Sequence, residues 1–299
     1  MVVGIISKPS QEYQIFEKIL IYYFAVLTLF IIYFSASVAE NIIYIALNGL
    51  FVALILMVHY LANKTKNGGI LIYLTPLILF PFTYTEAGKL VHLIYNNWFD
   101  QFFASLDQYL FGVNPALWIE RFDYPILNEL FRTGYGSYYF LIIGGAFIHF
   151  FYGHSEEDAH KMVTTITLGF CISYLLFIIL PTQGPRFFYM NLFHTEMDGY
   201  VISNLQKQLI AFGGFRGGAF PSSHVAISLL VCFSLFNYHR RAFRIFTFFT
   251  VLLIIGTIWG RYHYVVDAVA GIILAIIVWK LYPLFLKKKS AQSENDHCA

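Results

Sequence analysis

Long apolar runs separated by short polar loops dominate the chain from residue 16 to residue 285. A helix that crosses a bilayer needs about 20 mostly apolar residues. Eight runs approach or exceed this length, and each is expected to form a helix. The runs cover residues 16–38, 41–61, 69–95, 135–152, 161–181, 222–238, 243–260 and 263–285. The pattern predicts an all-α fold, a polytopic membrane helix bundle with about eight spans.

The first run raises the question of whether it stays in the protein. It ends in Ser37-Val38-Ala39, which is similar to a signal-peptidase site. Its leading region carries Glu12 and Glu17 and is long for a signal peptide, so we interpret the run as a retained span. We expect residues 1–66 to form two amino-terminal transmembrane helices, residues 67–286 a core, and residues 287–299 a polar cytoplasmic tail.

The third run contains helix-breaking and charged residues. Pro76 and Pro81 interrupt it, and Glu86, Lys89 and His92 follow at three-residue spacing. Its outer half is therefore expected to be kinked and sheltered by neighbouring helices. These three polar side chains either line a substrate cavity or form a network that holds helices together, and the spacing slightly favours the network.

Residues 96–134, between the third and fourth runs, are too polar to cross a membrane and unusually aromatic. Phe, Tyr and Trp alternate there with Asp100, Asp107, Glu120 and Arg121. Aromatic and charged side chains at helical spacing are typical of short helices in the membrane interface. We expect such helices here, on the outer side.

Composition also places the protein in a bilayer. Hydrophobic residues make up 58% of the 299 residues and charged residues only 12%, against roughly 25% in a soluble domain. A water-soluble fold of this size could not bury so much apolar surface. A soluble enzyme, a disordered chain and a nucleic-acid-binding protein with a basic face are therefore excluded.

Positive charges in the short loops indicate orientation. With the amino terminus inside, the inner segments hold most of the 19 Lys and Arg residues, as the positive-inside rule expects. These inner cations are Lys8, Lys18, Lys64, Lys66, Lys161, Arg240, Arg241, Arg244, Lys287, Lys288 and Lys289. Residues 96–134 and 183–220 then face outward. Three segments that could carry chemistry also fall on the outer side.

The first of these segments, residues 217–224, reads Gly-Gly-Ala-Phe-Pro-Ser-Ser-His and directly precedes the sixth run. Pro in the first turn and Ser at the cap are typical of a helix beginning. Unpaired backbone N–H groups there form an anion site, which His224 could touch. Taken alone, the segment fits equally well a capped helix whose histidine only faces lipid headgroups.

The second segment, residues 260–267, opens the eighth run. His263 and Asp267 are four residues apart, so on a helix they share a face and can hydrogen-bond. The carboxylate would fix one imidazole tautomer and leave the other nitrogen free as a nucleophile or base. A pair that only holds helices together is the alternative, although an ionisable residue in a span is a functional hypothesis by default. Arg261 beside the pair is a natural phosphate ligand.

The third segment, residues 181–186, ends the fifth run in a turn with an outward Arg186. Arg186 and Arg216 each fit either a phosphate ligand or a contact with lipid headgroups. The sequence contains no His-Glu-x-x-His or cysteine-rich metal pattern and no nucleotide-binding glycine loop. We therefore expect no metal ion and no cofactor.

Pro-Ser-Ser-His at 221–224, followed about forty residues later by His263-x-x-x-Asp267, resembles the type-2 phosphatidic acid phosphatase superfamily, which includes the vanadium haloperoxidases. Ser223 stands where that family usually has Gly. The resemblance covers roughly residues 96–285 and implies a six-helix phosphatase core.

The arginines depart from the usual family pattern. Arg261 lies two residues before the histidine, as in the inositol phosphorylceramide synthase branch, whereas most members have Arg six residues before it, where this chain has Thr257. The family's first motif places a Lys before Arg-Pro, and this chain has only Pro185-Arg186.

The resemblance also implies a mechanism without metal. His263 would attack phosphorus while Asp267 holds its tautomer, and His224 would serve as acid and then as base. The phosphate oxygens would be bound by Arg186, Arg261, Arg216, Ser222, Ser223 and the backbone amides near 217–223.

Three functions follow from these observations. The first is an integral membrane phosphatase, in the plasma membrane with its site on the extracytoplasmic side, that hydrolyses a lipid phosphate. The second is a phosphotransferase that passes a phospho-headgroup to a lipid alcohol, favoured by Arg261 and the two added spans. The third, a transporter, would need polar residues repeated near the middle of several spans. Membrane lipids are the other expected partners, nucleic acid is not, and the oligomeric state stays open.

Overall fold

The computed structural model describes residues 12–35, 37–65, 68–213 and 215–296, and for residues 38, 209–213 and 285–296 only the backbone. Of the predicted inner cations, Lys8, Lys66 and the three lysines at 287–289 lie outside the described residues or have side chains outside them. The end of the predicted tail, residues 297–299, also lies outside. In the described part, regular structure is helical apart from one isolated bridge between Thr182 and Gly218.

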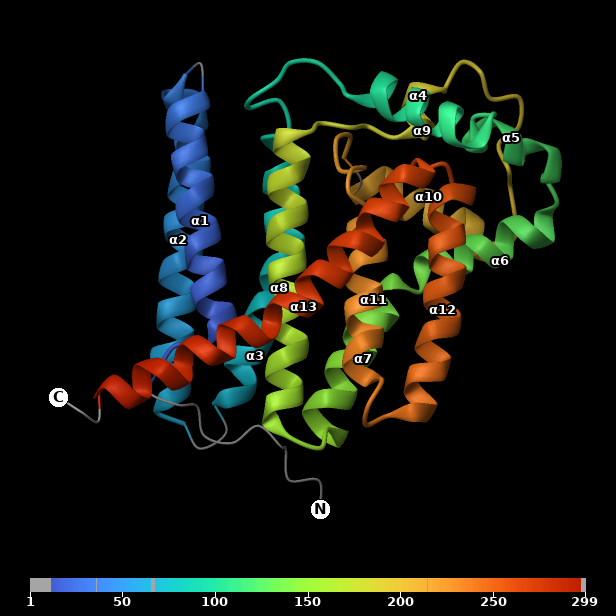
Figure 1. Ribbon diagram of the computed structural model, residues 1–299. Coiled ribbons are helices and arrows are strands. Elements are labelled where there is room, and N and C mark those ends of the chain that lie inside the picture. Colours follow the sequence, from blue (N-terminus) through green and yellow to red (C-terminus); the bar gives the residue numbers. More distant parts are fainter. Residues whose placement is uncertain (1–11, 36, 66–67, 214, 297–299) are drawn as a thin grey trace.

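Helices follow one another along the whole described chain (Figure 1). They are α1 (Ile15–Phe34), α2 (Val38–Asn63), α3 (Gly69–Lys89), α4 (Asp100–Phe111), α5 (Pro115–Trp118), the 3-10 helix η1 (Ile119–Phe122), α6 (Pro125–Gly136), α7 (Tyr138–Tyr152), α8 (Glu156–Ile179), α9 (Pro185–Phe188), α10 (Val201–Gly213), α11 (Ser223–Leu235), α12 (Arg240–Trp259) and α13 (Val265–Asp296). The expected all-α membrane bundle is confirmed.

Six helices in the described part are long and apolar enough to cross a membrane: α1, α2, α3, α8, α12 and α13. The other two expected spans are α7 and α11, which have 15 and 13 residues. At about 1.5 Å per residue, each is shorter than the hydrocarbon core of roughly 30 Å. The expected spans, residues 135–152 and 222–238, are therefore longer than the helices that form there.

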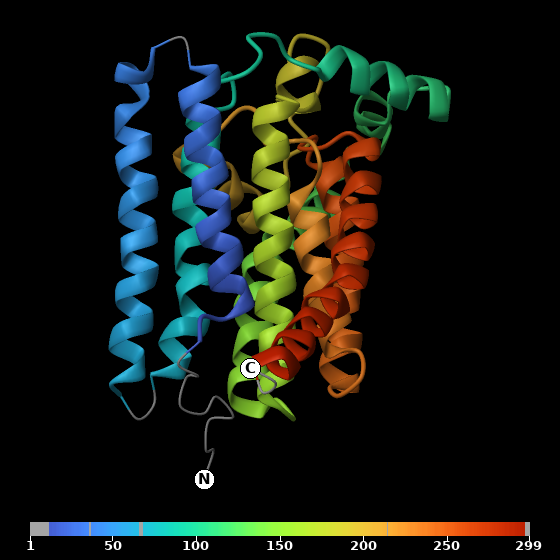
Figure 2. The same ribbon diagram turned by 60° about the vertical axis from the view of Figure 1, so that its left-hand side comes forward.

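Helix α8 occupies the centre of the bundle, and α2 lies at its edge. In the apolar window of α8 72% of the residues are buried, against 17% in α2. Figures 1 and 2 both place α1 and α2 at one side, where they pack on α3 and α8. Small residues permit close approach in the centre, because a Cβ on Gly169 would lie 2.9 Å from Ile227 of α11.

Helix α3 runs through Pro76 and Pro81 and ends at Lys89, although the apolar run extends to residue 95. Of the polar side chains expected to form a network, His92 lies in the loop beyond the helix and is exposed. Its Nδ1 contacts the Tyr95 carbonyl at 2.9 Å. Glu86 is buried, and neither of its oxygens has a hydrogen-bond partner in the described part of the chain. The expected network is therefore not formed by these residues.

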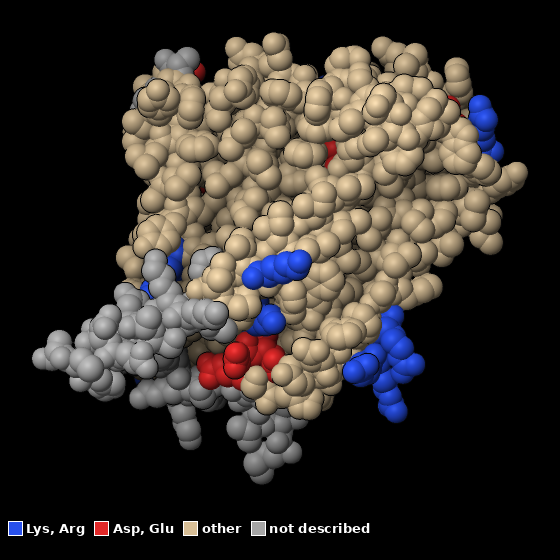
Figure 3. All heavy atoms as spheres, in the orientation of Figure 1, with Lys and Arg blue, Asp and Glu red and all other residues tan. Residues whose placement is uncertain are grey.

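Residues 96–134 form the expected short helices, of which α4 and α5 gather with α9 at one end of the bundle while α6 runs beside α12 (Figure 1). The start of α1 and the later part of α13 lie at the opposite end, as do the turns that lead into α8 and α12 (Figures 1 and 2). On the face in Figure 3 the upper half is almost entirely uncharged, and most Lys, Arg, Asp and Glu side chains lie in the lower half. The end that carries α4 and α9 is called the upper end below.

Candidate active site

Main-chain hydrogen bonds join the three predicted segments at the upper end. The amide of Ala219 donates to the Thr182 carbonyl at 3.0 Å, beside the Thr182–Gly218 bridge. The amide of Arg186 donates to the Arg261 carbonyl at 2.8 Å. The amide of Ser222 donates to the Asp267 carbonyl at 3.0 Å. Residues 181–186, 217–224 and 260–267 therefore form one site.

His263 lies in the turn between α12 and α13, two residues before α13 begins, and not on that helix as its spacing to Asp267 predicted. The amides of Tyr262 and His263 both donate to the carbonyl of Thr257, at 3.0 and 3.2 Å. Arg261 has a positive φ of 60°, which turns the chain sharply after α12. This fold-back, rather than a helical face, directs His263 toward the segment before α11.

The ring of His263 is held mainly by a carbonyl oxygen. Its Nδ1 lies 2.7 Å from the carbonyl of Ala219 and 3.6 Å from Oδ2 of Asp267. The same Oδ2 accepts the amide of Tyr264 at 2.8 Å. Because a carbonyl can only accept, Nδ1 carries the hydrogen, and Nε2 keeps a lone pair. The tautomer predicted from the Asp267 spacing is thus set by Ala219, with Asp267 close enough to interact with a charged ring.

His224 lies in the first turn of α11, between two tyrosine rings. The centroid of its ring is 4.8 Å from that of Tyr135 and 4.3 Å from that of Tyr138. Its Nε2 lies 3.1 Å from the Tyr135 hydroxyl, and its Nδ1 is buried without a partner in the described residues. The rings of His224 and His263 are 5.9 Å apart, centroid to centroid. Two histidines from separate motifs therefore share one site.

The three predicted phosphate-binding arginines differ in their partners. Arg261 is buried, and its guanidinium forms an ion pair with Glu120 at 2.8 Å and donates to the Thr195 carbonyl at 2.9 Å. Burial lowers the pKa of Arg261, while the charge of Glu120 opposes that shift. Glu120 is 141 residues away in the sequence, which gives no sign of this pairing. The role of Arg261 as a phosphate ligand stays a prediction.

Arg186 and Arg216 lie near one aromatic ring. The guanidinium carbon of Arg186 is 5.5 Å from the Phe187 ring centroid, and that of Arg216 is 4.5 Å from it. Arg186 is partly buried in α9, whereas Arg216 is exposed. Neither side chain forms an ion pair or hydrogen bond with the described residues, so both charges are available to an anion.

The serines before α11 are buried. Ser222 is the predicted helix cap, and its Oγ accepts the amide of Val225 at 3.5 Å. Pro221, expected in the first helical turn, comes before this cap. Ser223 is 3% exposed. The amides of Ala219 and Ser222, which were expected to bind phosphate, already donate to carbonyls, so at most the remaining amides of this segment are available.

Two buried aspartates of α4 hold the site loops in place. The carboxylate of Asp100 accepts the amides of Gln183 and Gly184, both at 2.9 Å, and the Tyr264 hydroxyl at 3.0 Å. Burial raises the pKa of Asp100, while these three hydrogen bonds lower it. Asp100 thereby joins the turn before Arg186 to the residue after His263.

Asp107, about two turns after Asp100 on α4, caps the helix that carries Asp267. Its two oxygens accept the amides of Val265 and Val266, at 2.9 and 3.1 Å. Burial raises the pKa of Asp107 as well, and the two amides lower it. A carboxylate at a helix amino terminus is stabilising, so Asp107 fixes where α13 begins.

Sequence reasoning identified Asp100, Asp107 and Glu120 only as charges on interfacial helices, and it overlooked Arg132 and Tyr135. None of these residues belongs to a motif. A weak signal did exist, since Arg132 and Tyr135 are three residues apart and would share a helical face. In the described part of the chain no group of three or more His, Cys, Asp or Glu residues is arranged to hold a metal ion.

Comparison with known proteins adds independent information. A family model described as the PAP2 superfamily matches residues 102–281, more than half of the chain. A PA-phosphatase related-family protein from Dictyostelium discoideum is 30% identical over 105 residues, which are 33% of this chain and 19% of that protein. The match thus spans about a fifth of that relative's length. No solved structure matches. The chain belongs to the PAP2 superfamily.

Proposed function

We propose that this membrane protein is a lipid phosphate phosphatase that hydrolyses a phosphomonoester or diphosphate of a lipid through a phosphohistidine. The observation that carries the proposal is the histidine pair. His263 has its Nδ1 bound to a carbonyl and its Nε2 without a hydrogen bond in the described residues, and the ring of His224 lies 5.9 Å away. Membership of the PAP2 superfamily and the related phosphatase support a phosphatase-type reaction.

The reaction would proceed in two displacements. Nε2 of His263 attacks phosphorus, the bond to the lipid oxygen breaks, and that oxygen takes a proton from His224. Water then attacks the phosphohistidine, His224 takes the water proton, and phosphate leaves with the His263 ring restored. Asp267, 3.6 Å from Nδ1, stabilises the ring while it carries positive charge.

Positive charge at the phosphate would come from this chain alone. Arg186 and Arg216 have no carboxylate partner in the described residues, and the first turn of α11 begins directly beside His224. Preorganised cations and helix amides stabilise the charge on a transferring phosphoryl group. We therefore propose a metal-independent reaction.

The site would face the extracytoplasmic side of the membrane, in the plasma membrane. The support for this orientation is the loop cations, because Lys64, Arg240, Arg241 and Arg244 all lie at the end opposite the site. A lipid phosphate in the outer leaflet would then reach the histidines with its acyl chains still among the helices.

Product analysis on the purified full chain tests the proposal. We expect phosphate release from a long-chain lipid phosphate in detergent micelles, in the presence of a strong chelator and without any acceptor lipid. Release that requires a lipid alcohol such as ceramide or diacylglycerol, with the headgroup transferred to it, would instead identify the phosphotransferase. Activity that is lost in chelator and restored by a divalent ion would contradict the metal-free mechanism.

A further inference from the structure

Arg132 of α6 is a buried cation whose partners in the described residues are all neutral. Only 7% of the surface of Arg132 is exposed. Its Nη1 donates to the Tyr262 hydroxyl at 3.3 Å, and its Nη2 donates to the Met197 carbonyl at 3.4 Å. Its Nε is buried and has no hydrogen-bond partner in the described part of the chain. Both hydrogen bonds are long, and neither partner carries a negative charge that would balance the charge of the guanidinium.

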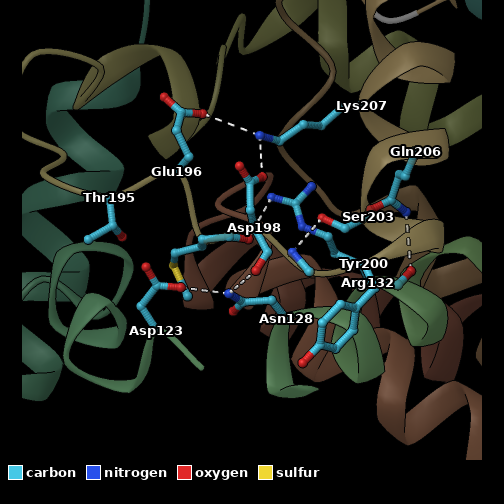
Figure 4. Close-up of polar contacts among 12 residues, drawn as sticks. Asp123, Asn128, Arg132, Thr195, Glu196, Asp198, Tyr200, Ser203, Gln206 and Lys207 are labelled. Atoms are coloured by element: carbon cyan, nitrogen blue, oxygen red, sulfur yellow. Dashed lines mark hydrogen bonds and ion pairs between the residues drawn. The ribbon is translucent and has the colours of Figure 1, made fainter. Parts of the chain in front are cut away.

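The loop that Arg132 contacts carries two acidic side chains, Glu196 and Asp198, which pair with another cation (Figure 4). Lys207 of α10 forms ion pairs with Asp198 and, at 3.5 Å, with Glu196. Arg132 contacts this loop only through the main chain, at Met197. Both carboxylates pair with Lys207, and neither forms an ion pair with Arg132 in the described residues.

The other two carboxylates on this side of the site also have partners. Asp123 accepts the side-chain amide of Asn128 at 2.6 Å. Glu129 accepts four main-chain amides, those of residues 200–203, and so caps α10. Desolvation raises the pKa of Glu129, but these amides outweigh it and hold the pKa below its usual value. In the described part of the chain, none of these carboxylates forms an ion pair with Arg132.

Close packing of α6 against α12 keeps Arg132 inside. A Cβ on Gly256 would lie 2.2 Å from the Phe131 carbonyl oxygen, and a Cβ on Gly134 would lie 2.6 Å from the Leu252 carbonyl oxygen. The two helix backbones are thus in contact on either side of Arg132 in the sequence. Turning α6 to bring the guanidinium into water would break this contact.

Two tyrosines link Arg132 to the histidine pair. The Tyr262 ring, next to His263 in the chain, stacks 4.4 Å from Tyr135, whose hydroxyl contacts Nε2 of His224. Burial raises the pKa of Tyr262, and the charges of Arg132 and Arg186 both oppose that shift. Arg132 contacts this hydroxyl directly, at 3.3 Å, whereas Arg186 affects its pKa only through its charge.

We propose that Arg132 binds the phosphate oxyanion of the substrate, together with Arg186, and that Arg261 serves to hold the site loops. This inference rests on the proposed function and adds a ligand to it from outside the three motifs. A buried charge without a counter-ion is costly, so it persists where a ligand supplies the opposite charge. Arg261 already has that counter-ion in Glu120.

The test compares orthovanadate binding in the purified full chain and four variants. Orthovanadate resembles the transition state of phosphoryl transfer and needs no knowledge of the lipid. Binding is measured as the rise in melting temperature with vanadate concentration, because a ligand of the native state at free concentration L stabilises it by RT ln(1 + L/Kd), from which the Kd follows. The variants are Arg132→Met, Arg132→Lys, Arg261→Met and, as matched control, Arg121→Met, whose side chain is exposed on η1.

We expect Arg132→Met to weaken vanadate binding at least tenfold while the unliganded protein melts at the wild-type temperature or above it, because an uncompensated charge is gone. Arg132→Lys should recover part of the affinity. Arg261→Met should have the opposite effects. The unliganded protein should melt at a lower temperature than wild type, while its vanadate affinity should stay close to that of Arg121→Met. This opposite pattern distinguishes a ligand-binding arginine from a structural one.

Three results would overturn the inference. Vanadate affinity of Arg132→Met equal to that of wild type would show that Arg132 does not bind the anion. Loss of the unliganded fold in both Arg132 variants would show that its role is structural. Failure of the wild-type protein to bind vanadate or inorganic phosphate would overturn the proposed function as well, whereas the first two results leave it standing.

Discussion

Two buried pairs of a histidine and a carboxylate lie at opposite ends of this molecule. In the amino-terminal helices, Nδ1 of His59 lies 3.0 Å from Oε1 of Glu17, and both side chains are buried. At the upper end, Nδ1 of His263 lies 3.6 Å from Asp267 and is bound more closely by the Ala219 carbonyl. The pair with the shorter distance between nitrogen and carboxylate oxygen therefore lies outside the candidate site.

The surroundings of the two pairs explain this difference. The ring of Tyr13 stacks on His59 at 4.1 Å, and the Gln14 amide binds Glu17 at 2.7 Å, so the pair fastens α2 to the start of α1. His263 instead meets a second histidine. A buried pair can thus serve only to hold helices together, and reactivity also needs an acid and cations beside it.

Among the variants that test this comparison, we expect replacement of His263 to have the largest effect on activity. His263→Ala should reduce turnover by roughly 10⁶-fold with every substrate, because no covalent intermediate can form. His59→Ala should retain most of its turnover, measured as phosphate release per folded protein after size-exclusion chromatography. Equal loss in both variants would remove the distinction between the pairs.

Loss of His224 should have a smaller and selective effect. With an alkyl phosphate the leaving oxygen needs a proton, so His224→Ala should slow the reaction by roughly 10²–10⁴-fold. With an aryl phosphate the leaving group needs little help, so a burst of phenol should still appear at near wild-type rate. Identical losses with both substrates, measured by rapid mixing, would contradict the assignment of His224 as the acid.

Asp267→Asn tests whether Asp267 or the Ala219 carbonyl sets the tautomer of His263. Where a triad carboxylate also sets the tautomer of its histidine, its conversion to an amide costs roughly 10⁴-fold. Here the Ala219 carbonyl sets the tautomer, so we expect a clearly smaller loss, confined to kcat. A loss as large as 10⁴-fold would show that Asp267 orients the ring after all.

The smallest effect on activity is expected at Glu17. Glu17→Gln keeps an oxygen near His59 but removes the charge, so the native state should lose about 1–3 kcal/mol while kcat stays near wild type. A calorimetric melting curve and a lipid phosphate assay on one preparation check both parts. A kcat that falls together with the melting temperature would mean that the amino-terminal helices shape the site.

The apolar pattern predicted the bundle because runs of about 20 apolar residues have few alternatives to membrane helices. It overestimated α11, which ends at Leu235 and is followed by a turn over the last three residues of the run. It also failed to place Asp100 and Asp107 inside the protein. Their partners are 83 and 158 residues away, and no local periodicity reports such contacts.

The sequence identified the candidate site residues that belong to a motif, such as His224 and His263. It could not identify which charged side chains are paired with partners far away in the sequence. Arg261 lies inside a motif and is neutralised by Glu120. Arg132 lies outside the motifs and keeps its charge unbalanced in the described structure. Which arginine faces an anion therefore depends on tertiary contacts.

The central claim is that His263 becomes covalently phosphorylated, and trapping that intermediate tests it most directly. His224→Ala protein, incubated briefly with a ³²P-labelled aryl phosphate, should accumulate label because hydrolysis of the phosphohistidine lacks its base. The account predicts acid-labile, alkali-stable label on the peptide that contains His263, and none in the His224→Ala/His263→Ala double variant. Label on any other residue, or steady turnover without label, would contradict it.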